Sequence, residues 1–371
     1  MSYAFLGGQR SMALDERRNR AYQQALAQVI TAESVVLDLG AGLGVLGLLA
    51  AQLGAKRVYL VEPEDVLGVA ADFVRTQGRQ AQVVCRQGWI ETTPLPEPVD
   101  VLVSVFTGNF LLEEDLLPLL FLARDRYLKP GGRMIPDRAV MVAVPVSAPR
   151  LHAEEVAIWS EPHLGLDLQA GRAYASQQIY YERKHLAQAQ YLAQPLPLWE
   201  LDLTTAQDTH CQVEVTYPIT ADGLCHGWCG WFDLRLGDWL STSPKDPPLH
   251  WSAAFLPLDP PIAVTVGEEV TFRLVRPPQG CWSWEVQTTT THRRHSTFLG
   301  LPLTPQTLHR SSLDHRPQRT VRGEAARFVL EHCDGKWTIQ QLSAQLHHRY
   351  PDLFNPQQAV HYVQSLVKQY S

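Results

Sequence analysis

The sequence has no long hydrophobic run and no excess of positive charge. None of its apolar stretches approaches the roughly 20 residues that a membrane-spanning helix needs, and the N-terminus MSYAFLGGQRSMALDERR lacks a signal-peptide core. With 32 Lys and Arg against 38 Asp and Glu, the net charge of −6 gives no general attraction to nucleic acid or anionic membranes. We therefore expect a cytoplasmic protein whose partners are neither membranes nor, in bulk, nucleic acids.

Cysteine is also scarce, with six scattered residues that are more typical of reduced thiols than of a disulfide framework. Cys225 and Cys229 in CHGWC are the only close pair. In a regular strand, positions 225, 227 and 229 share one face, so two thiolates at a metal are one interpretation. Buried strand thiols are the favoured interpretation, and we predict no metal site.

The remaining composition, 45% hydrophobic and 19% charged over 371 residues, predicts two or three folded domains. Residues 12–30 have helical spacing of apolar positions. Short β-branched runs such as VVLDL, RVYLVE, AQVVC and VDVLVSV then alternate with helical stretches, which is typical of a parallel sheet covered by helices. The fold class is therefore α/β, with a Rossmann-like domain over 1–140.

The sequence pattern changes after PGGRMIPD. Alternating segments such as CQVEVTYPI, GWFDLRL and EVTFRLV predict a β-rich, barrel-like domain over 141–291. Residues 292–318 lack sustained periodicity and are expected to form a linker with one or two short strands. Residues 319–371 predict three short helices, with a capping box from Thr338 to Gln341 at the start of the second.

A glycine-rich turn follows the first predicted strand. Asp38 lies in that strand, and GAGLG opens the next helix, where free N–H groups and small residues allow backbone to approach a ligand. Glu62 ends the second strand, where a carboxylate can accept from both hydroxyls of a ribose. This spacing predicts a nucleoside cofactor. NAD is disfavoured because Val45 occupies the position of the third fingerprint glycine, and glycines used only for packing are the other alternative.

VLDLGAGLGVLGLLAAQLGAKRVYLVEP resembles the cofactor motif of protein arginine methyltransferases. ARDRYLKPGGRMIPDRA, STSPKDPPLHW and AVTVGEEVTFRL are similar to later segments of that family, so the resemblance covers roughly residues 3–290. It implies a methyltransferase dependent on S-adenosylmethionine. It also implies a set of cofactor-binding residues: Arg18, Asp38, Gly40, Gly42, Glu62 and Glu91.

The roles that the resemblance implies suit the residue types. Arg18 would pair with the methionine carboxylate of the cofactor, Glu62 would hold the ribose, and Glu91 would accept from the adenine amine. Asp38 and the two glycines would form the loop beneath. Without the resemblance, Arg18 and Glu91 would be interpreted as solvated surface charges.

The family's acceptor hairpin carries two glutamates that clamp a guanidinium, and the matching stretch here is SVFTGNFLLEE. Glu114 matches the second glutamate, whereas Val105 replaces the first. Valine offers neither a hydrogen-bond acceptor nor a charge to a guanidinium. We therefore favour an acceptor other than arginine; the alternative is an arginine methyltransferase in which Glu114, helped by Glu113 or another group, suffices.

Two further features follow from the same resemblance. His250 in PLHW and Asp15 match a proton-relay pair of the family, so the expected catalytic residues are Glu114, His250 and Asp15. Residues 181–203 lie where the family inserts a dimerisation arm, and Leu186, Tyr191, Leu192, Leu196 and Leu198 are the apolar residues expected to contact a partner. The prediction is a homodimer, and an internal helix packed on its own barrel is the alternative.

FVLEHCDGKWTIQQLSAQLHHRYPD resembles the PqqD-like fold, a small winged-helix domain that captures leader sequences of ribosomally made peptides. The resemblance covers roughly residues 300–371 and implies that a client adds a strand to a sheet edge. A helical cap without a ligand and a nucleic-acid-binding winged helix are the alternatives. The preferred function is methylation of a peptide or protein, with a precursor leader peptide held by this module. A non-catalytic peptide-binding scaffold is the third possibility.

Overall fold

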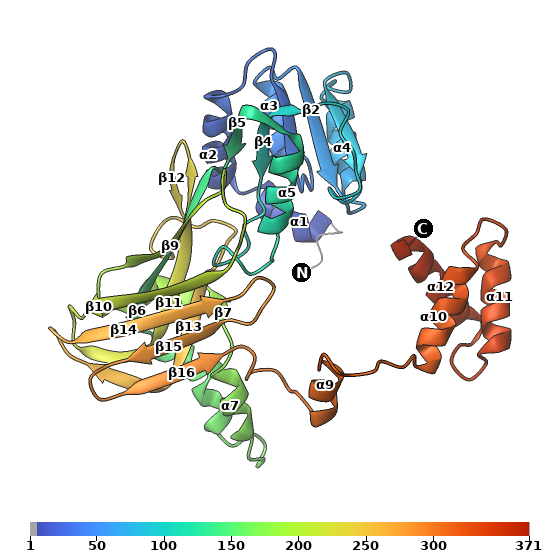
Figure 1. The fold of residues 1–371 in the computed structure, drawn as a ribbon. Coiled ribbons are helices and arrows are strands. Elements are labelled where there is room, and N and C mark those ends of the chain that lie inside the picture. The colour runs from blue at the N-terminus through green and yellow to red at the C-terminus, as the bar shows by residue number, and fades with distance from the viewer. Residues whose placement is uncertain (1–5, 371) are drawn as a thin grey trace. The chain divides into compact units, whose positions relative to one another are not determined.

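The chain forms two compact units, 1–302 and 303–371, in a computed structural model that describes residues 6–370 (Figure 1). The first unit combines a parallel α/β sheet with antiparallel sheets, and the second is helical. No helix among residues 6–370 is both long enough and apolar enough to cross a bilayer.

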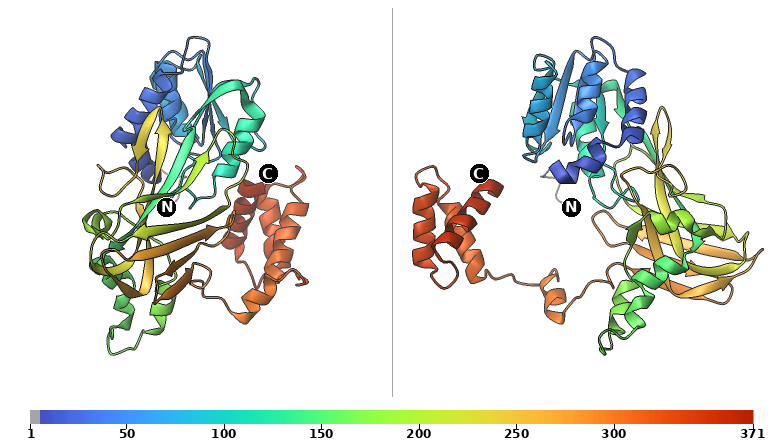
Figure 2. Two further views of the ribbon diagram at one scale, coloured as in Figure 1. Left: turned by 60° about the vertical axis from the view of Figure 1, so that its left-hand side comes forward. Right: turned by 180° about the vertical axis from the view of Figure 1, so that it is seen from behind.

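The parallel sheet has the strand order β3-β2-β1-β4-β5, with helices on both faces (Figures 1 and 2). Its strands are β1 (Val35–Leu39), β2 (Arg57–Glu62), β3 (Val83–Gln87), β4 (Val99–Ser104) and β5 (Leu128–Ile135). Its helices are α1 (Leu6–Ala13), α2 (Glu16–Ala27), α3 (Val45–Gln52), α4 (Leu67–Thr76) and α5 (Leu117–Tyr127). This confirms the predicted α/β class. Every residue of β1 is buried, as expected for a central strand covered on both faces.

The strand order reverses beside β1, whose neighbours are β2 and β4. In such sheets the ligand crevice lies outside the carboxyl ends of the strands at this reversal. The buried hydroxyl of Tyr22 on α2 donates to the carbonyl of Ser104 at the end of β4, at 3.0 Å. This contact fixes the N-terminal helices next to that edge of the sheet.

Antiparallel sheets follow in the chain. One has the order β7-β13-β11-β6-β8, with β12 paired to β11 and β9 paired to β6; the other has the order β10-β14-β15-β16. Trp228 of β11 stacks on Phe272 of β14 at 4.7 Å, so these buried rings join the two sheets. The strands are β6 (Arg138–Ser147), β7 (Tyr180–Glu182), β8 (Gln190–Tyr191), β9 (Leu196–Asp202), β10 (Cys211–Pro218), β11 (Gly223–Leu236), β12 (Asp238–Ser241), β13 (Ala253–Val264), β14 (Glu269–Arg276), β15 (Ser283–Gln287) and β16 (His292–Ser296).

The expected shared face of Cys225 and Cys229 is wrong. The pairing of β11 with β13 shifts register between Cys225 and Gly227, which interrupts the alternation of side chains. Cys225 packs in the main core and Cys229 in a separate core cluster, and both thiols are buried. Burial raises the pKa of the Cys225 thiol to about 12. Two neutral thiols in different cores do not form a metal site.

For residues 181–203 the structure favours the alternative to a dimerisation arm, in which the segment packs on its own barrel. Leu186 and Leu192 are 0% exposed and Leu198 is 8% exposed, because this segment packs on its own barrel as α8 (Lys184–Gln188), β8 and β9. The exposed helical insertion precedes it, between β6 and β7. It contains α6 (Pro149–Glu155), the 3-10 helix η1 (Ala157–Ser160) and α7 (Ala170–Ala175).

The predicted linker, 292–318, contains one of the short strands that were expected in it and, in addition, a short helix. β16 pairs with β15 as a sheet strand, and α9 (Pro305–Arg310) follows. The second unit then contains α10 (Val321–Glu331), α11 (Ile339–Arg349) and α12 (Pro356–Tyr370), around a core that includes Val329, Leu346 and Val363.

The capping box of Thr338 and Gln341 begins α11 as predicted. Among residues 303–370 the structure contains no strand, so this unit has neither a wing nor a sheet edge of its own. The expectation that a client peptide adds a strand here is therefore wrong.

Candidate functional site

The glycine loop after β1 has no room for side chains. Gly40 and Gly42 have φ values of 68° and 52°, in the left-handed region that favours glycine. A Cβ on Gly40 would lie 2.1 Å from the ring of Phe106, and one on Gly42 would lie 2.6 Å from Oε1 of Gln9 on α1. The loop is therefore a bare backbone surface at the carboxyl edge of the sheet, and a ligand can approach it closely.

Glu62 stabilises this loop through both carboxylate oxygens. Oε2 accepts from the backbone N–H of Gly42 at 2.9 Å, and Oε1 accepts from that of Glu64 at 3.0 Å. Burial raises the pKa of Glu62, and these two hydrogen bonds only partly oppose that effect. Because a carboxylate has about four acceptor positions, each oxygen retains capacity for a ligand hydroxyl.

Asp38 is 2% exposed, and its Oδ2 accepts from the N–H of Gly47 in α3 at 2.7 Å. Burial raises the pKa of Asp38 to about 7, with a further increase from the neighbouring Glu62 that the Gly47 hydrogen bond partly offsets. A group with this pKa changes its charge near neutral pH. A bound cation would favour its ionised form.

Arg18 brings a buried positive charge to the same place. Its side chain is 4% exposed, and both Nε and Nη2 donate to Oδ1 of Asn19. Burial lowers the pKa of Arg18, although Tyr22, Asp15 and Asp38 raise it. Among the described residues no ion pair forms with this guanidinium. A buried cation without a carboxylate partner fits an anionic ligand group.

Glu91 is exposed, in the loop after β3, and its backbone carbonyl accepts from Nη1 of Arg126 at 2.8 Å. It follows the strand that lies beside β2, so it is at the same edge of the sheet as Glu62. Arg18, Asp38, Glu62 and the glycines form the inner part of the site, and Glu91 lies at its rim.

Asp15 and His250 are 235 residues apart in sequence and in direct contact in the structure. Oδ2 of Asp15 accepts from the backbone N–H of His250 at 2.8 Å and contacts Nδ1 of its ring at 3.0 Å. Oδ1 of Asp15 caps α2 by accepting from the N–H of Arg18 at 3.0 Å. One carboxylate therefore links the cofactor-side helix to the PLHW loop.

The pKa values of this pair favour a neutral imidazole beside a carboxylate. Burial lowers the pKa of His250, and the hydrogen bond that its ring donates to Asp15 only partly restores it. Burial would raise the pKa of Asp15, but hydrogen bonds from His250 and the N–H of Arg18 outweigh it, so that pKa is lowered. With Nδ1–H held by the carboxylate, Nε2 is the nitrogen that is able to accept a proton.

The loop from Thr107 to Asp115 carries Glu113 and Glu114 and is held at both ends. Nε1 of Trp251 donates to the carbonyl of Thr107 at 2.7 Å. The guanidinium of Arg276 forms a bidentate ion pair with Asp115, at 2.7 and 2.5 Å. Sequence reasoning identified neither Trp251 nor Arg276. The position of Trp251 next to His250 is the one signal that could have indicated Trp251, and no local pattern marks Arg276.

The middle of this loop is strained. Phe110 and Leu111 have φ values of 46° and 65°, which are uncommon for residues with side chains. The Phe110 ring is 0% exposed and stacks on Trp282 at 5.3 Å. A Cβ on Gly230 of β11 would lie 2.5 Å from this ring, so Gly230 is needed for Phe110 to pack there.

Where the family's first glutamate would stand, the surroundings are neutral. Val105 is partly buried, Phe106 packs against the glycine loop, and Thr107 is 2% exposed. The Thr107 hydroxyl is buried without a hydrogen-bond partner among the described residues. Loss of solvation raises the pKa of Glu113, which a hydrogen bond from Asn109 partly opposes. The acceptor region thus combines apolar and hydroxyl groups on one side with two adjacent carboxylates on the other.

Comparisons with known proteins identify both parts of the first unit. Residues 37–135 match a methyltransferase domain, and residues 137–289 match the arginine methyltransferase oligomerization subdomain. Both matches end before the second unit. The chain is similar to probable protein arginine N-methyltransferase 6 of Arabidopsis thaliana, with 28% identity over an alignment of 309 positions that covers 71% of each protein.

It is also similar to the histone-arginine methyltransferase CARMER of Anopheles gambiae, with 30% identity over 304 residues, 77% of this chain and 48% of that protein. Among solved structures, the Trypanosoma brucei PRMT1 enzyme–prozyme heterotetrameric complex with AdoHcy aligns with a TM-score of 0.73 and 26% identity, over 80% of this chain and 99% of that one. The two domain matches, residues 37–135 and 137–289, therefore lie within the unit that contains the glycine loop.

Proposed function

Since this chain is an S-adenosylmethionine-dependent methyltransferase with a methyltransferase domain followed by the arginine methyltransferase oligomerization subdomain, we propose that it methylates a peptide or protein at a group other than arginine. The observation that carries the choice of acceptor is Val105, in the place of a carboxylate that a guanidinium needs. The match to an enzyme family leaves the non-catalytic scaffold without support.

The cofactor would supply an electrophilic methyl group on a sulfonium. In our proposal Arg18 pairs with its carboxylate, Glu62 accepts from its ribose hydroxyls, and Glu91 accepts from its adenine amine. Gly40 and Gly42 have no side chains, so the cofactor approaches their backbone closely, and Asp38 contributes negative charge beneath them. The buried, unpaired charge of Arg18 and the remaining acceptor capacity of Glu62 support this assignment.

The acceptor must lose a proton when it receives a methyl group. Asp15 holds His250 with Nε2 as the free ring nitrogen, so His250 is the proposed proton acceptor and Asp15 the residue that orients it. Glu114 is the remaining carboxylate that matches the family's clamp and is proposed to hold the acceptor. A neutral imidazole suits this work near neutral pH because it is able to take up a proton.

Mass spectrometry of reacted peptides tests the choice of acceptor. The enzyme is incubated with S-adenosylmethionine and a peptide library in which each nucleophilic residue type is varied, and fragmentation locates the methyl group. We expect the methyl group on a residue other than arginine. Methylarginine as the main product would overturn this proposal and favour the single-glutamate arginine methyltransferase, in which Glu114 holds the guanidinium.

The second unit is proposed to hold the client, for example the leader of a precursor peptide, while the first unit methylates it. The helical pattern of α10–α12 and the exposed apolar side chains of Trp337, Ile339 and Leu353 support a peptide-binding surface on the helices. Tethering raises the local concentration of acceptor, so a weak acceptor pocket suffices.

Removal of residues 303–371 tests the tethering. We expect loss of methylation of the client at low concentration, with cofactor affinity unchanged, because the cofactor residues lie in the other unit. Equal rates for the full chain and the shortened chain at every client concentration would contradict the proposal. Calorimetry with S-adenosylhomocysteine provides the control that the shortened chain is folded.

The partner is proposed to be a second copy of this chain, held by the insertion between β6 and β7 in place of residues 181–203. Some of its apolar side chains are exposed, among them Trp159 at 41%, Leu164 at 89% and Leu166 at 59%. Apolar groups gathered in this way are typical of an interaction surface. Light scattering is expected to give a dimer that the double substitution L164E/L166E dissociates; a monomeric mass of the unaltered chain would refute the dimer.

A further inference from the structure

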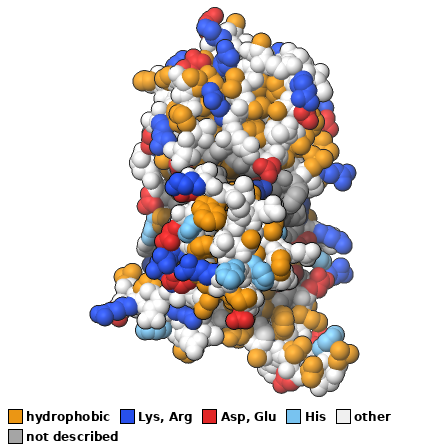
Figure 3. All heavy atoms as spheres, turned by 90° about the vertical axis from the view of Figure 1, so that its right-hand side faces the viewer, with side chains coloured by type: hydrophobic (Ala, Val, Ile, Leu, Met, Phe, Trp, Pro, Cys, Tyr) orange, Lys and Arg blue, Asp and Glu red, His pale blue; other side chains and the backbone are white. Residues whose placement is uncertain are grey.

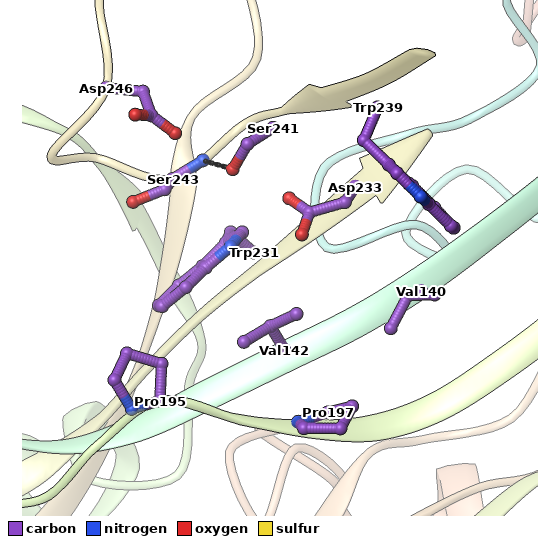
Figure 4. A pocket seen from close by; sticks show the side chains of 10 residues that line it. All are labelled: Val140, Val142, Pro195, Pro197, Trp231, Asp233, Trp239, Ser241, Ser243 and Asp246. Carbon is purple, nitrogen blue, oxygen red and sulfur yellow. Dashed lines mark hydrogen bonds between the residues drawn. The ribbon is translucent and has the colours of Figure 1, made fainter. Parts of the chain in front are cut away.

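A hollow of about 550 Å³ lies on the barrel, away from the glycine loop (Figure 4). It crosses β9, β6, β11 and β12, and is on the face of β11 opposite to the main core. Val142 of β6 pairs with Trp231 of β11, and Val140 of β6 pairs with Asp233. Both valines therefore line the hollow on the strand between β11 and β9. The floor of the hollow is therefore apolar sheet with one carboxylate in it.

Two indole rings lie on either side of that carboxylate. Trp231 is 5% exposed at the floor, whereas Trp239 on β12 is 52% exposed. Figure 4 shows Asp233 between them, with Ser241 above. A large exposed indole at the edge of a hollow is costly in water unless a ligand covers it, and its ring face attracts cations.

Asp233 has hydrogen bonds but, within residues 6–370, no cationic partner. Burial raises the pKa of its carboxyl, and hydrogen bonds from Ser241, Trp231 and the backbone N–H of Thr242 only partly oppose that effect. Oδ1 of Asp233 is buried without a hydrogen-bond partner among the described residues. The charged neighbour that acts on this carboxyl is a second carboxylate, Asp246, which also lines the hollow. Two carboxylates that repel one another in an apolar setting favour a bound cation.

The cationic side chains near the hollow already interact with other groups. Arg183 donates to two backbone carbonyls of segment 243–246. Lys245 donates at 2.8 Å to two backbone carbonyls that precede β8. Arg235, two residues along β11, is ion-paired with Asp137. None of these side chains is paired with Asp233, so a cationic group of a ligand would be its counter-ion.

We propose that this hollow binds an arginine side chain of a bound peptide or protein, with the guanidinium stacked on Trp239 and paired with Asp233. A planar guanidinium matches both an indole face and a carboxylate, whereas an ammonium is a more strongly hydrated point charge. An uncharged apolar ligand would cover the carboxylate of Asp233 without giving it a counter-ion. None of residues 104–115 lines the hollow, so this site is distinct from the acceptor loop and does not depend on which atom is methylated.

The test uses the full chain labelled with 5-fluorotryptophan, in which the ¹⁹F resonance of Trp239 is assigned by its loss in Trp239→Phe. The probe is N-acetyl-arginine N-methylamide, and the citrulline analogue is the matched neutral control. We expect the arginine probe to shift the Trp239 resonance to saturation and the citrulline probe to leave it in place. The lysine analogue is expected to bind more weakly than the arginine probe.

Two charge-removing variants locate the site. Asp233→Asn and Asp246→Asn, which preserve size, are each expected to weaken the arginine probe by about tenfold. Glu114→Gln, in the acceptor loop, is expected to leave the Trp239 shift unchanged, which separates this site from the proposed function. A Trp239 resonance that does not move, moves equally with citrulline, or titrates identically in both folded Asp→Asn variants overturns the proposal.

Discussion

The cofactor side and the acceptor side of the site meet at Phe106, yet they differ in how they are built. The cofactor side is made of buried charges that hold backbone, as when Glu62 accepts from the N–H of Gly42. The acceptor side replaces a charge with Val105 and positions its glutamates on a loop with strained backbone. The comparison indicates that cofactor chemistry constrains one side closely, while the other adapts to the group being methylated.

The largest effect is expected when the carboxylate of the cofactor side, Glu62, is removed. Glu62→Ala loses acceptors for two ligand hydroxyls, each worth about 1.5 kcal/mol or more, and also frees the glycine loop. We expect the dissociation constant of S-adenosylmethionine to rise by about a hundredfold or more, as measured by calorimetry. Glu33→Ala, which removes an exposed glutamate paired with Lys56, is the control. Unchanged affinity in folded Glu62→Ala would remove Glu62 from the cofactor site.

The next effect concerns the residue that joins the two sides. Asp15→Ala loses the cap of α2, worth about 1 kcal/mol, and the charge-assisted hydrogen bonds to His250, so we expect the free energy of unfolding to fall by about 2 kcal/mol. Asp15→Asn keeps an acceptor for the cap and is expected to lose less. Urea denaturation measures both variants. Equal losses in the two variants would show that the charged pairing with His250, and not the cap, accounts for the stability.

A third experiment tries to make the two sides alike. Val105→Glu restores a carboxylate beside the acceptor, and we expect methylation of an arginine peptide to increase by about tenfold, because a charged acceptor binds a guanidinium bidentately. Val105→Gln is the matched neutral control. If glutamate gives no more methylarginine than glutamine, the absent carboxylate does not explain the selectivity of the site.

The sequence alone predicted the cofactor side better than the acceptor side, and there is a physical reason. β1 and β2 follow from β-branched runs, and the glycine loop follows from spacing, because these are local signals. The ion pair of Arg276 with Asp115 and the packing of Phe110 over Gly230 join segments more than 100 residues apart, so no local pattern marks them. Only the family resemblance brought Asp15 and His250 together in advance.

The same distinction applies to the dimerisation arm that was expected at residues 181–203. Residues 181–203 are as apolar as an interface, but tertiary contacts bury Leu186 and Leu192 within the chain. The exposed insertion before them has Leu164 and Leu166 among polar residues, a pattern that also describes an ordinary loop. Composition does not distinguish an apolar group buried in its own fold from one left for a partner.

The smallest expected effect is a pH dependence confined to the cofactor side. The pKa of Asp38 is raised to about 7, so below that pH the carboxyl is largely protonated in the free protein. A cationic cofactor favours the ionised form, so its affinity is expected to rise by about fivefold between pH 6 and pH 7.5. Calorimetry over this range measures the change.

The sign for stability is opposite. The folded state holds the Asp38 proton more tightly than the unfolded chain, whose carboxyl has its ordinary pKa of 3.8, so this residue's contribution to stability falls as pH rises from about 4 to about 7. Asp38→Asn keeps an acceptor for the N–H of Gly47 and is expected to flatten both pH profiles. A binding profile that stays equally steep in Asp38→Asn would assign the titration to another group, such as Glu62, whose pKa burial also raises.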